Sequence, residues 1–148
     1  AIDLGFVGVP EKIDPEVINA LINEKMIPVI APVGMGEDGL TYNINADTAA
    51  GAISASMKAS RMIMLTDVSG VLDKSGNLIP ELTINEALDL IKNKVVVGGM
   101  IPKLRTCIEA VEGGAEASVI MDGRMSHSLL LELFTEHGVG TIIRKNAI

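Results

Sequence analysis

The feature that most constrains the fold is a repeated switch between two hydrophobic periods along the 148 residues. Short apolar runs typical of buried strands alternate with segments whose apolar residues recur at helical spacing. Glycine or proline stands at the joints between them. This alternation predicts an α/β fold with an open, mostly parallel sheet and helices on both faces. Ligands bind such sheets beyond the carboxyl ends of the strands, so a site is expected in the loops that follow strands.

The same pattern predicts the individual elements. A capping box at Thr83 and Glu86 begins one helix, and Asp14 followed by Pro15 begins another. The short apolar run at residues 28–31 predicts a buried strand. In all, strands are expected at residues 4–9, 28–31, 40–44, 62–65, 118–121 and 139–143, and helices at residues 15–22, 45–58, 83–91, 101–111 and 126–134.

Composition fits this fold class and excludes several functions. With 48% hydrophobic and 21% charged residues, the chain is expected to fold, and no apolar run approaches the ~20 residues of a membrane span. A net charge of −7 opposes nucleic-acid binding. Cys107 is the only cysteine, which excludes an intrachain disulfide and a multi-cysteine metal site, and it is expected to be buried. We expect a cytoplasmic enzyme domain without a nucleic-acid or membrane partner and without a protein-held metal.

Residues 34–39 match the glycine pattern G-x-G-x-x-G of dinucleotide-binding loops. That pattern binds a pyrophosphate only where a helix begins directly after the glycines. Here residues 40–42 continue as an extended segment, and Glu37 and Asp38 would repel phosphates. We interpret the motif as a turn. The sequence contains no G-x-x-x-x-G-K-[ST] loop, so a Walker-type ATPase site is not expected.

A polar cluster at residues 43–47 follows an extended segment and enters an alanine-rich helix. An extended backbone would point Asn43, Asn45 and Asp47 to one side. Either asparagine can cap the helix, and Asp47 in the first turn complements the helix dipole. Capping explains these residues about as well as a function does, so both interpretations stay open.

A second polar segment, residues 66–73, follows the strand predicted at residues 62–65. Small and polar residues at the exit of a buried central strand suit a loop whose backbone approaches a nucleotide. An ordinary turn, in which Asp67 and Ser69 bond their own backbone, explains the segment equally well.

The strongest functional indication comes from residues 98–103, Gly-Gly-Met-Ile-Pro-Lys. The paired glycines allow close backbone approach, and Pro102 fits the first turn of a helix. Lys103 then lies at the positive end of the helix dipole, where a cation is normally disfavoured. A local rule broken beside paired glycines indicates a site where the lysine and helix N–H groups hold nucleotide phosphates. A solvated surface lysine is the alternative.

Taken together, these segments resemble the C-terminal half of the acetylglutamate kinases, a branch of the amino acid kinase family. The match covers nearly the whole chain in the family's order, and the Asn-Ile-Asn-Ala-Asp run distinguishes this branch from others. The matching segments are residues 3–8, 28–32, 43–47, 66–73, 98–103 and 129–140.

The resemblance implies transfer of the γ-phosphoryl group of ATP to the side-chain carboxylate of N-acetyl-L-glutamate, on the arginine pathway. Lys103 would be one of two lysines that stabilise charge on the transferring group, Asp47 would hold those lysines, and Asn43 would contact the substrate. Mg²⁺ would be carried by the ATP. The acceptor carboxylate is already ionised at neutral pH, so no general base is needed. The implied nucleotide-binding residues are Asp67, Val68, Ser69, Gly70, Val71 and Leu72, with Val95, Val96 and Val97 beside the adenine or ribose.

The family enzymes are much longer than this chain. Their first half supplies a second lysine, a glycine-rich phosphate loop and a substrate-binding arginine, which these residues do not include. Residues 1–148 are therefore expected to form a single nucleotide-binding lobe, without the N-terminal substrate lobe. Such a lobe is expected to bind nucleotide at best and to have no turnover alone. Apolar surface left uncovered by the other lobe is also expected.

Regulation and two other functions stay open at this stage. Arginine-sensitive relatives, which are homo-oligomers, bind arginine as a feedback inhibitor in this half, and Glu132 and Gly138 match their effector positions, with His127 nearby. An exposed acid on a helix is the alternative for Glu132. The other functions are an aminoadipate-type kinase lobe and a non-catalytic nucleotide or arginine sensor. The presence of both Lys103 and Asp47 favours a kinase, provided that the two side chains face each other.

Overall fold

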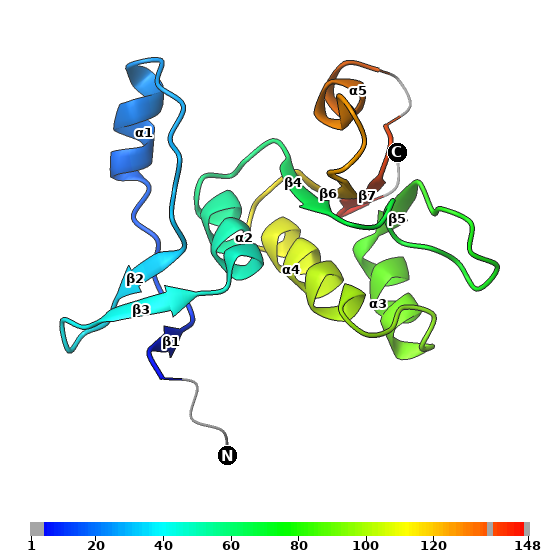
Figure 1. Cartoon of the computed structure of the whole chain (residues 1–148), viewed down its shortest axis with the longest axis horizontal. Helices are drawn as coiled ribbons and strands as arrows, with labels where there is room; N and C mark the ends of the chain where they lie inside the picture. The colour runs from blue at the N-terminus through cyan, green and yellow to red at the C-terminus, as the bar shows by residue number, and fades with distance from the viewer. Residues whose placement is uncertain (1–4, 136–137, 147–148) are drawn as a thin grey trace.

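The computed structural model describes residues 5–135 and 138–146. Within these ranges the chain forms seven strands and five helices (Figure 1). The strands are β1 (Val7–Gly8), β2 (Val33–Met35), β3 (Thr41–Ile44), β4 (Met62–Thr66), β5 (Glu81–Thr83), β6 (Ala117–Asp122) and β7 (Thr141–Arg144). The helices are α1 (Glu16–Asn23), α2 (Ala46–Ser56), α3 (Ile84–Lys92), α4 (Met100–Glu112) and α5 (Ser128–Phe134).

The strands divide between two sheets, one of order β1-β3-β2 and one of order β4-β6-β7-β5. β1 is parallel to β3, β4 to β6 and β5 to β7, whereas β2 and β3, and β6 and β7, are antiparallel. The predicted α/β class with mostly parallel strands is confirmed, although the strands form two sheets rather than one. β3 leads directly into α2, which carries the chain from the small sheet to the large one (Figure 1).

The hydrophobic core lies between the four-stranded sheet and helices α3 and α4. Leu104, Cys107 and Ile108 of α4 pack there with Ile120 of β6 and Ile143 of β7. The predicted burial of Cys107 is confirmed, because its side chain is 0% exposed. α5 lies on the opposite face of this sheet (Figure 1), so helices cover both faces.

The helices begin where local sequence favours it. The side chain of Asn45 accepts a hydrogen bond from the Thr48 N–H at 3.1 Å and caps α2. Thr83 and Glu86 form the predicted capping box of α3. α4 begins after Gly99, with Pro102 in its first turn, where a missing N–H costs nothing.

Two predicted strands differ from the structure. Residues 28–31 form no strand, and Val29 is 96% exposed. These residues pair with no strand of the described chain, so the apolar run has no ladder partner. The first predicted strand is reduced to β1, with Leu4 outside the described residues. β5 was not predicted, because three residues with one buried side chain give no readable alternation.

The turn predicted for residues 34–39 is confirmed at residues 36–39, whereas Gly34 and Met35 belong to β2, a strand that was not predicted. The Gly39 N–H donates to the Gly36 carbonyl at 2.9 Å, and the chain continues as β3 rather than as a helix. The glycines therefore close a hairpin between β2 and β3 and cradle no pyrophosphate.

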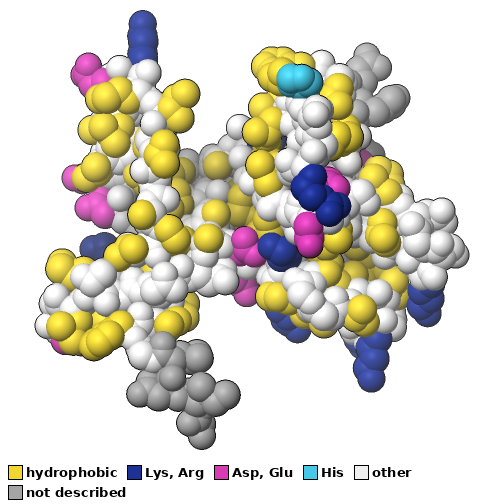
Figure 2. All heavy atoms as spheres, in the orientation of Figure 1, with side chains coloured by type: hydrophobic (Ala, Val, Ile, Leu, Met, Phe, Trp, Pro, Cys, Tyr) yellow, Lys and Arg dark blue, Asp and Glu magenta, His cyan; other side chains and the backbone are white. Residues whose placement is uncertain are grey.

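The first part of the chain leaves its apolar residues uncovered. α1 buries none of its residues, although Val17 and Leu21, and likewise Ile18 and Ile22, are four residues apart as on one helix face. Figure 2 shows hydrophobic side chains spread over α1 and the small sheet. The expectation of uncovered apolar surface is met in this region.

Candidate functional site

Lys103 and Asp47 meet where the first turns of α4 and α2 come together. The Lys103 Nζ donates to the Asp47 Oδ2 at 2.8 Å, across 56 residues of sequence. The two side chains are 27% and 32% exposed, so the pair is half-buried but reachable by a ligand. The condition set by the sequence, that the two side chains face each other, holds.

The close packing of α2 on α4 depends on a glycine. A Cβ on Gly51 would lie 2.8 Å from the Cγ2 of Thr106, so a side chain there would force Thr106 or the helices to shift. The absence of that side chain brings the beginnings of both helices, and with them Asp47 and Lys103, within reach of each other. Two helix N-termini converge here, which favours an anionic ligand.

Cys107 lies one helical turn after Lys103, beneath the ion pair. Burial chiefly, and the negative charge of Asp47 to a smaller extent, raise the pKa of its thiol to about 12 against the opposing effect of Lys103. The thiol is therefore neutral at physiological pH. Its role is packing.

The polar cluster at residues 43–47 divides among three tasks. Asn45 caps α2, and Asp47 turns toward Lys103. Asn43 lies exposed on β3. The cap of α2 and the contact with Lys103 thus involve different residues, and the substrate contact of Asn43 stays a prediction.

The predicted nucleotide loop lies at the carboxyl end of β4, as an α/β sheet requires. Asp67, Val68 and Ser69 are exposed, and the Thr66 hydroxyl donates to the Asp67 carboxylate at 3.2 Å. Gly70 and Val71 instead enter the core. Leu72 is 39% exposed and forms an isolated bridge with Leu78.

The second predicted nucleotide segment, residues 95–97, follows α3 and is only partly exposed. Val96 is 4% exposed and belongs to the core, whereas Val97 is 65% exposed. Of these two side chains, that of Val97 is the one free to meet an adenine or ribose.

Sequence reasoning missed Asp122, the last residue of β6, and Arg124, which lies two residues beyond it at the same edge. The Arg124 Nε and Nη2 donate to the two Asp122 oxygens at 3.0 and 2.8 Å. The Arg124 side chain and backbone N–H together lower the pKa of Asp122 to about 2. Asp122 pairs in register with Thr66, so this ion pair lies beside the Asp67 loop. The sequence carried a signal for this ion pair, because polar residues directly follow the apolar strand predicted at residues 118–121.

Comparison with known proteins identifies the family. A model described as the amino acid kinase family matches residues 1–122. This chain belongs to the amino acid kinase family. The acetylglutamate kinase of Gluconobacter oxydans is 64% identical over 143 residues, which are 97% of this chain and 48% of that protein. That of Parvibaculum lavamentivorans is 62% identical over 144 residues, 97% of this chain and 47% of that protein. The chain thus spans about half the length of the curated relatives it matches.

Solved structures agree with this family. N-acetylglutamate synthase from Neisseria gonorrhoeae, in complex with coenzyme A and L-arginine, superposes with a TM-score of 0.91 at 29% identity, covering 99% of this chain and 35% of that protein. Carbamate kinase from Giardia lamblia bound to AMP-PNP has a TM-score of 0.73 at 22% identity, covering 95% and 47%, and supports the fold.

The other predicted ligand position in this amino acid kinase chain is built around a buried acid. Glu132 is 6% exposed, and its carboxylate lies 3.4 Å from the Arg61 NH1 and accepts the Val139 N–H at 3.0 Å. A Cβ on Gly138 would collide with that carboxylate. The alternative of an exposed acid is therefore wrong. His127 is exposed with a φ of 60°, and Arg61 was not anticipated.

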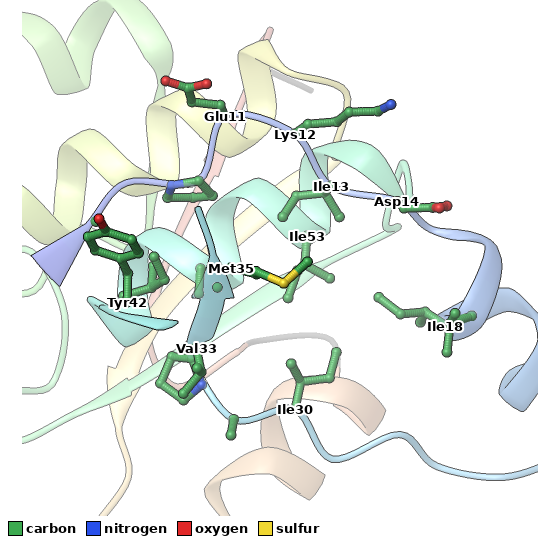
Figure 3. A pocket seen from close by; sticks show the side chains of 18 of the residues that line it. Glu11, Lys12, Ile13, Asp14, Ile18, Ile30, Val33, Met35, Tyr42 and Ile53 are labelled. Carbon is green, nitrogen blue, oxygen red and sulfur yellow. The ribbon is translucent and has the colours of Figure 1, made fainter. Parts of the chain in front are cut away.

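A hollow of about 940 Å³ lies away from the Lys103 pair, between α1, residues 28–33 and the small sheet. In Figure 3 the side chains of Ile13, Ile30 and Ile53 line it, while those of Glu11 and Lys12 point away from it. Its lining offers few polar groups, so we assign the chemistry to the carboxyl edge of the large sheet.

Two further findings concern the described residues alone. Among residues 5–135 and 138–146 no helix is long and apolar enough to cross a membrane. In the same ranges no three side chains of His, Cys, Asp or Glu gather as a metal site would require.

Proposed function

We propose that this chain is the ATP-binding half of an acetylglutamate kinase, an enzyme that phosphorylates the side-chain carboxylate of N-acetyl-L-glutamate. The observation that carries the proposal is the 2.8 Å contact of Lys103 with Asp47 where two helix N-termini converge. Identity of 62–64% to acetylglutamate kinases supports the same acceptor. The product, an acyl phosphate, would serve arginine biosynthesis in the cytoplasm.

The chemistry asks mainly for charge neutralisation and positioning. The Lys103 ammonium and the N–H groups at the beginning of α4 would stabilise negative charge on the transferring phosphoryl group. Asp47 would fix the direction of that ammonium through their hydrogen bond. Asn43, exposed on β3, would hold the acceptor. The acceptor carboxylate is a ready nucleophile and needs no base.

The nucleotide would lie along the carboxyl edge of the large sheet. The exposed residues Asp67, Val68 and Ser69 would contact it from the loop after β4, and Val97 would pack on the base or sugar. Mg²⁺ would arrive on the phosphates of ATP and neutralise their charge, as is usual in phosphoryl transfer. The Lys103 pair and this loop would then hold the two ends of one ligand.

The complete catalytic unit would include a second half beyond these residues, with residues 1–148 forming a single nucleotide-binding lobe. Support comes from the half-length match to the relatives and from the uncovered apolar residues of α1 and the small sheet. That surface would be covered by the substrate lobe, and we expect the whole enzyme to be a homo-oligomer. The chain alone would bind nucleotide without turning over.

Nucleotide binding is tested by isothermal titration of the chain with Mg-ATP. Lys103→Gln is expected to weaken binding about tenfold or more, because a charge-assisted hydrogen bond to phosphate is lost. Arg105→Gln is the matched control, since it removes one positive charge from an exposed position on the same helix. Equal affinities of the two variants would contradict the role of Lys103.

Turnover is tested in a chimera in which residues 1–148 replace the matching 48% of the Gluconobacter oxydans enzyme. Acyl phosphate is trapped with hydroxylamine as a hydroxamate. We expect product from N-acetyl-L-glutamate in the chimera and none from the chain alone, and Asp47→Asn in the chimera is expected to lower kcat. N-acetyl-L-aminoadipate serves as the competing acceptor. Turnover by the chain alone, or preference for aminoadipate, would overturn this assignment.

A second proposal concerns arginine as a feedback inhibitor near Glu132 and Gly138. The buried Glu132 carboxylate already lies 3.4 Å from a guanidinium, that of Arg61, which is the group a free arginine would present. The Neisseria gonorrhoeae synthase with a matching fold is a complex with L-arginine. Arginine titration of the chimera, with Glu132→Gln as the variant, tests this. Unchanged inhibition in Glu132→Gln would refute it.

A further inference from the structure

Two hydrogen bonds join the segment after β4 to the beginning of β7, and a third closes that segment on itself. The Val71 N–H donates to the Thr141 Oγ1 at 2.8 Å. The Thr141 hydroxyl donates in turn to the Ile79 carbonyl at 2.7 Å, and the Ile79 N–H donates to the Val71 carbonyl at 2.9 Å. Thr141 and Val71 are both 0% exposed. The three residues thus close a ring in which one side-chain hydroxyl both accepts and donates.

The loop backbone packs tightly against the Thr141 hydroxyl at Gly70. Gly70 has a φ of 147°, and a Cβ there would lie 2.6 Å from the Thr141 Oγ1 and 3.0 Å from the Thr141 N. On the far side of Val71, the Asp73 carboxylate accepts the N–H groups of Ser75 and Asn77 at 2.8 and 2.9 Å and closes the turn. The loop backbone is therefore fixed to β7 at Val71 and Ile79, and a further hydrogen bond runs from the Ile142 N–H to the Pro80 carbonyl at 2.9 Å. The exposed residues 67–69 lie just before these contacts in the sequence.

We propose that Thr141 is a positioning residue that fixes residues 67–72 in the conformation that binds the nucleotide. The inference rests on the proposed function, which assigns this loop to ATP. Without the hydroxyl, the buried Val71 N–H and the part-buried Ile79 carbonyl lose their partner, which is costly. The loop relieves that cost by moving away from β7, and Asp67 and Ser69 move with it.

The experiment compares two buried hydroxyl deletions in the same sheet. Thr141→Val keeps the shape and removes both hydrogen bonds, and Thr141→Ser restores the hydroxyl. The control is Ser118→Ala on β6, where a fully buried hydroxyl donates to the Cys107 carbonyl of α4 at 3.2 Å and not to the loop. Mg-ATP affinity is measured by calorimetry, stability by urea unfolding, and loop opening by hydrogen exchange of residues 67–80.

We expect both deletions to lower the urea midpoint, while Thr141→Val alone weakens Mg-ATP binding, about fivefold or more given the usual worth of a buried hydrogen bond. Hydrogen exchange is expected to rise within residues 67–80 in Thr141→Val and to return to normal in Thr141→Ser. A structural role alone would lower stability in both variants and leave affinity unchanged, which would overturn the proposal.

The inference and the proposed function fail in different ways. If the unsubstituted chain does not bind Mg-ATP, the nucleotide assignment for this chain fails, and an exchange increase confined to residues 67–80 still supports the anchor. If Mg-ATP binds and Thr141→Val binds it equally well, the inference fails alone. Should Thr141→Val not fold, Thr141→Cys replaces it, because a thiol is a weak donor and acceptor of nearly the same size.

Discussion

Residues 5–44 and the part of the chain that follows are both rich in apolar side chains, yet they differ in how far these side chains are buried. In residues 5–44 the one buried residue is Ile44, and Ile27 and Val29 are 90% and 96% exposed. From α2 onward, the described residues form a continuous core with fully buried side chains such as Leu104 and Ile120. Hydrophobic periodicity indicates that a segment has an apolar face suited to burial. Whether that face is buried depends on which other elements are present to cover it.

The exposure of residues 5–44 explains why the sequence prediction and the structure differ at residues 28–31. The run Pro-Val-Ile-Ala has the composition of a central strand, and a central strand needs neighbours on both sides. In the described chain it has none. The same argument applies to α1, whose apolar positions face open surface or the hollow of Figure 3. The proposed second half of the kinase would supply both covers.

The largest expected difference between the two regions is in thiol accessibility. Cys107 is 0% exposed and its thiol pKa is raised to about 12, so it reacts only when the core opens. A cysteine introduced by Val29→Cys, at a position 96% exposed, reacts at the rate of a free peptide thiol. A disulfide reagent is expected to modify Cys107 at least roughly a hundredfold more slowly than the introduced cysteine, because a folded core opens rarely. Similar rates would contradict the packed core.

Core truncation is expected to show the next largest effect. Leu104→Ala removes a fully buried side chain and is expected to cost about 2–5 kcal/mol in urea unfolding. Val29→Ala, the control, is expected to stay within about 0.5 kcal/mol because the side chain is exposed in this chain. In the chimera the same Val29→Ala change is expected to become costly. Equal costs for Val29→Ala in chain and chimera would contradict burial by the second half.

The sequence predicted what depends on local chemistry. The capping box at Thr83, the cap at Asn45 and the hairpin turn at residues 36–39 are set by neighbours a few residues away, and all three are present in the structure. The meeting of Lys103 with Asp47 spans 56 residues and was anticipated through the family resemblance rather than from spacing.

Other features depend on contacts that no local pattern encodes. The Arg61 contact with Glu132 joins residues 71 positions apart, and the Thr141 anchor joins residues 70 positions apart. The burial of Val96 depends on how α3 and α4 close over the sheet. Each of these is decided by tertiary packing, which the pattern of one chain segment does not report.

Helix caps offer a smaller test of the same comparison. Asn45→Ala removes the cap of α2, a helix packed on α4, and is expected to cost about 1 kcal/mol of stability. Asp14→Ala removes the 3.0 Å hydrogen bond to the Glu16 N–H at α1, which packs on little else, and is expected to leave global unfolding nearly unchanged. Urea midpoints of the two variants decide the point, and a larger cost for Asp14→Ala would reverse the comparison.

The smallest expected effect is electrostatic and compares one carboxylate from each region. Arg124 lowers the pKa of Asp122 to about 2 through its side chain and backbone N–H, and the Leu40 N–H and Tyr42 hydroxyl lower the pKa of Asp38. A carboxylate with a lowered pKa stabilises the fold above its unfolded pKa, and this contribution is lost as pH falls toward the folded value. Arg124→Gln is expected to raise the Asp122 titration midpoint, followed by NMR of the side-chain carboxyl, without moving Asp38, whereas Tyr42→Phe should do the reverse. If either variant shifted the titration midpoints of both carboxylates, the two regions would be electrostatically coupled. That result would contradict their separation.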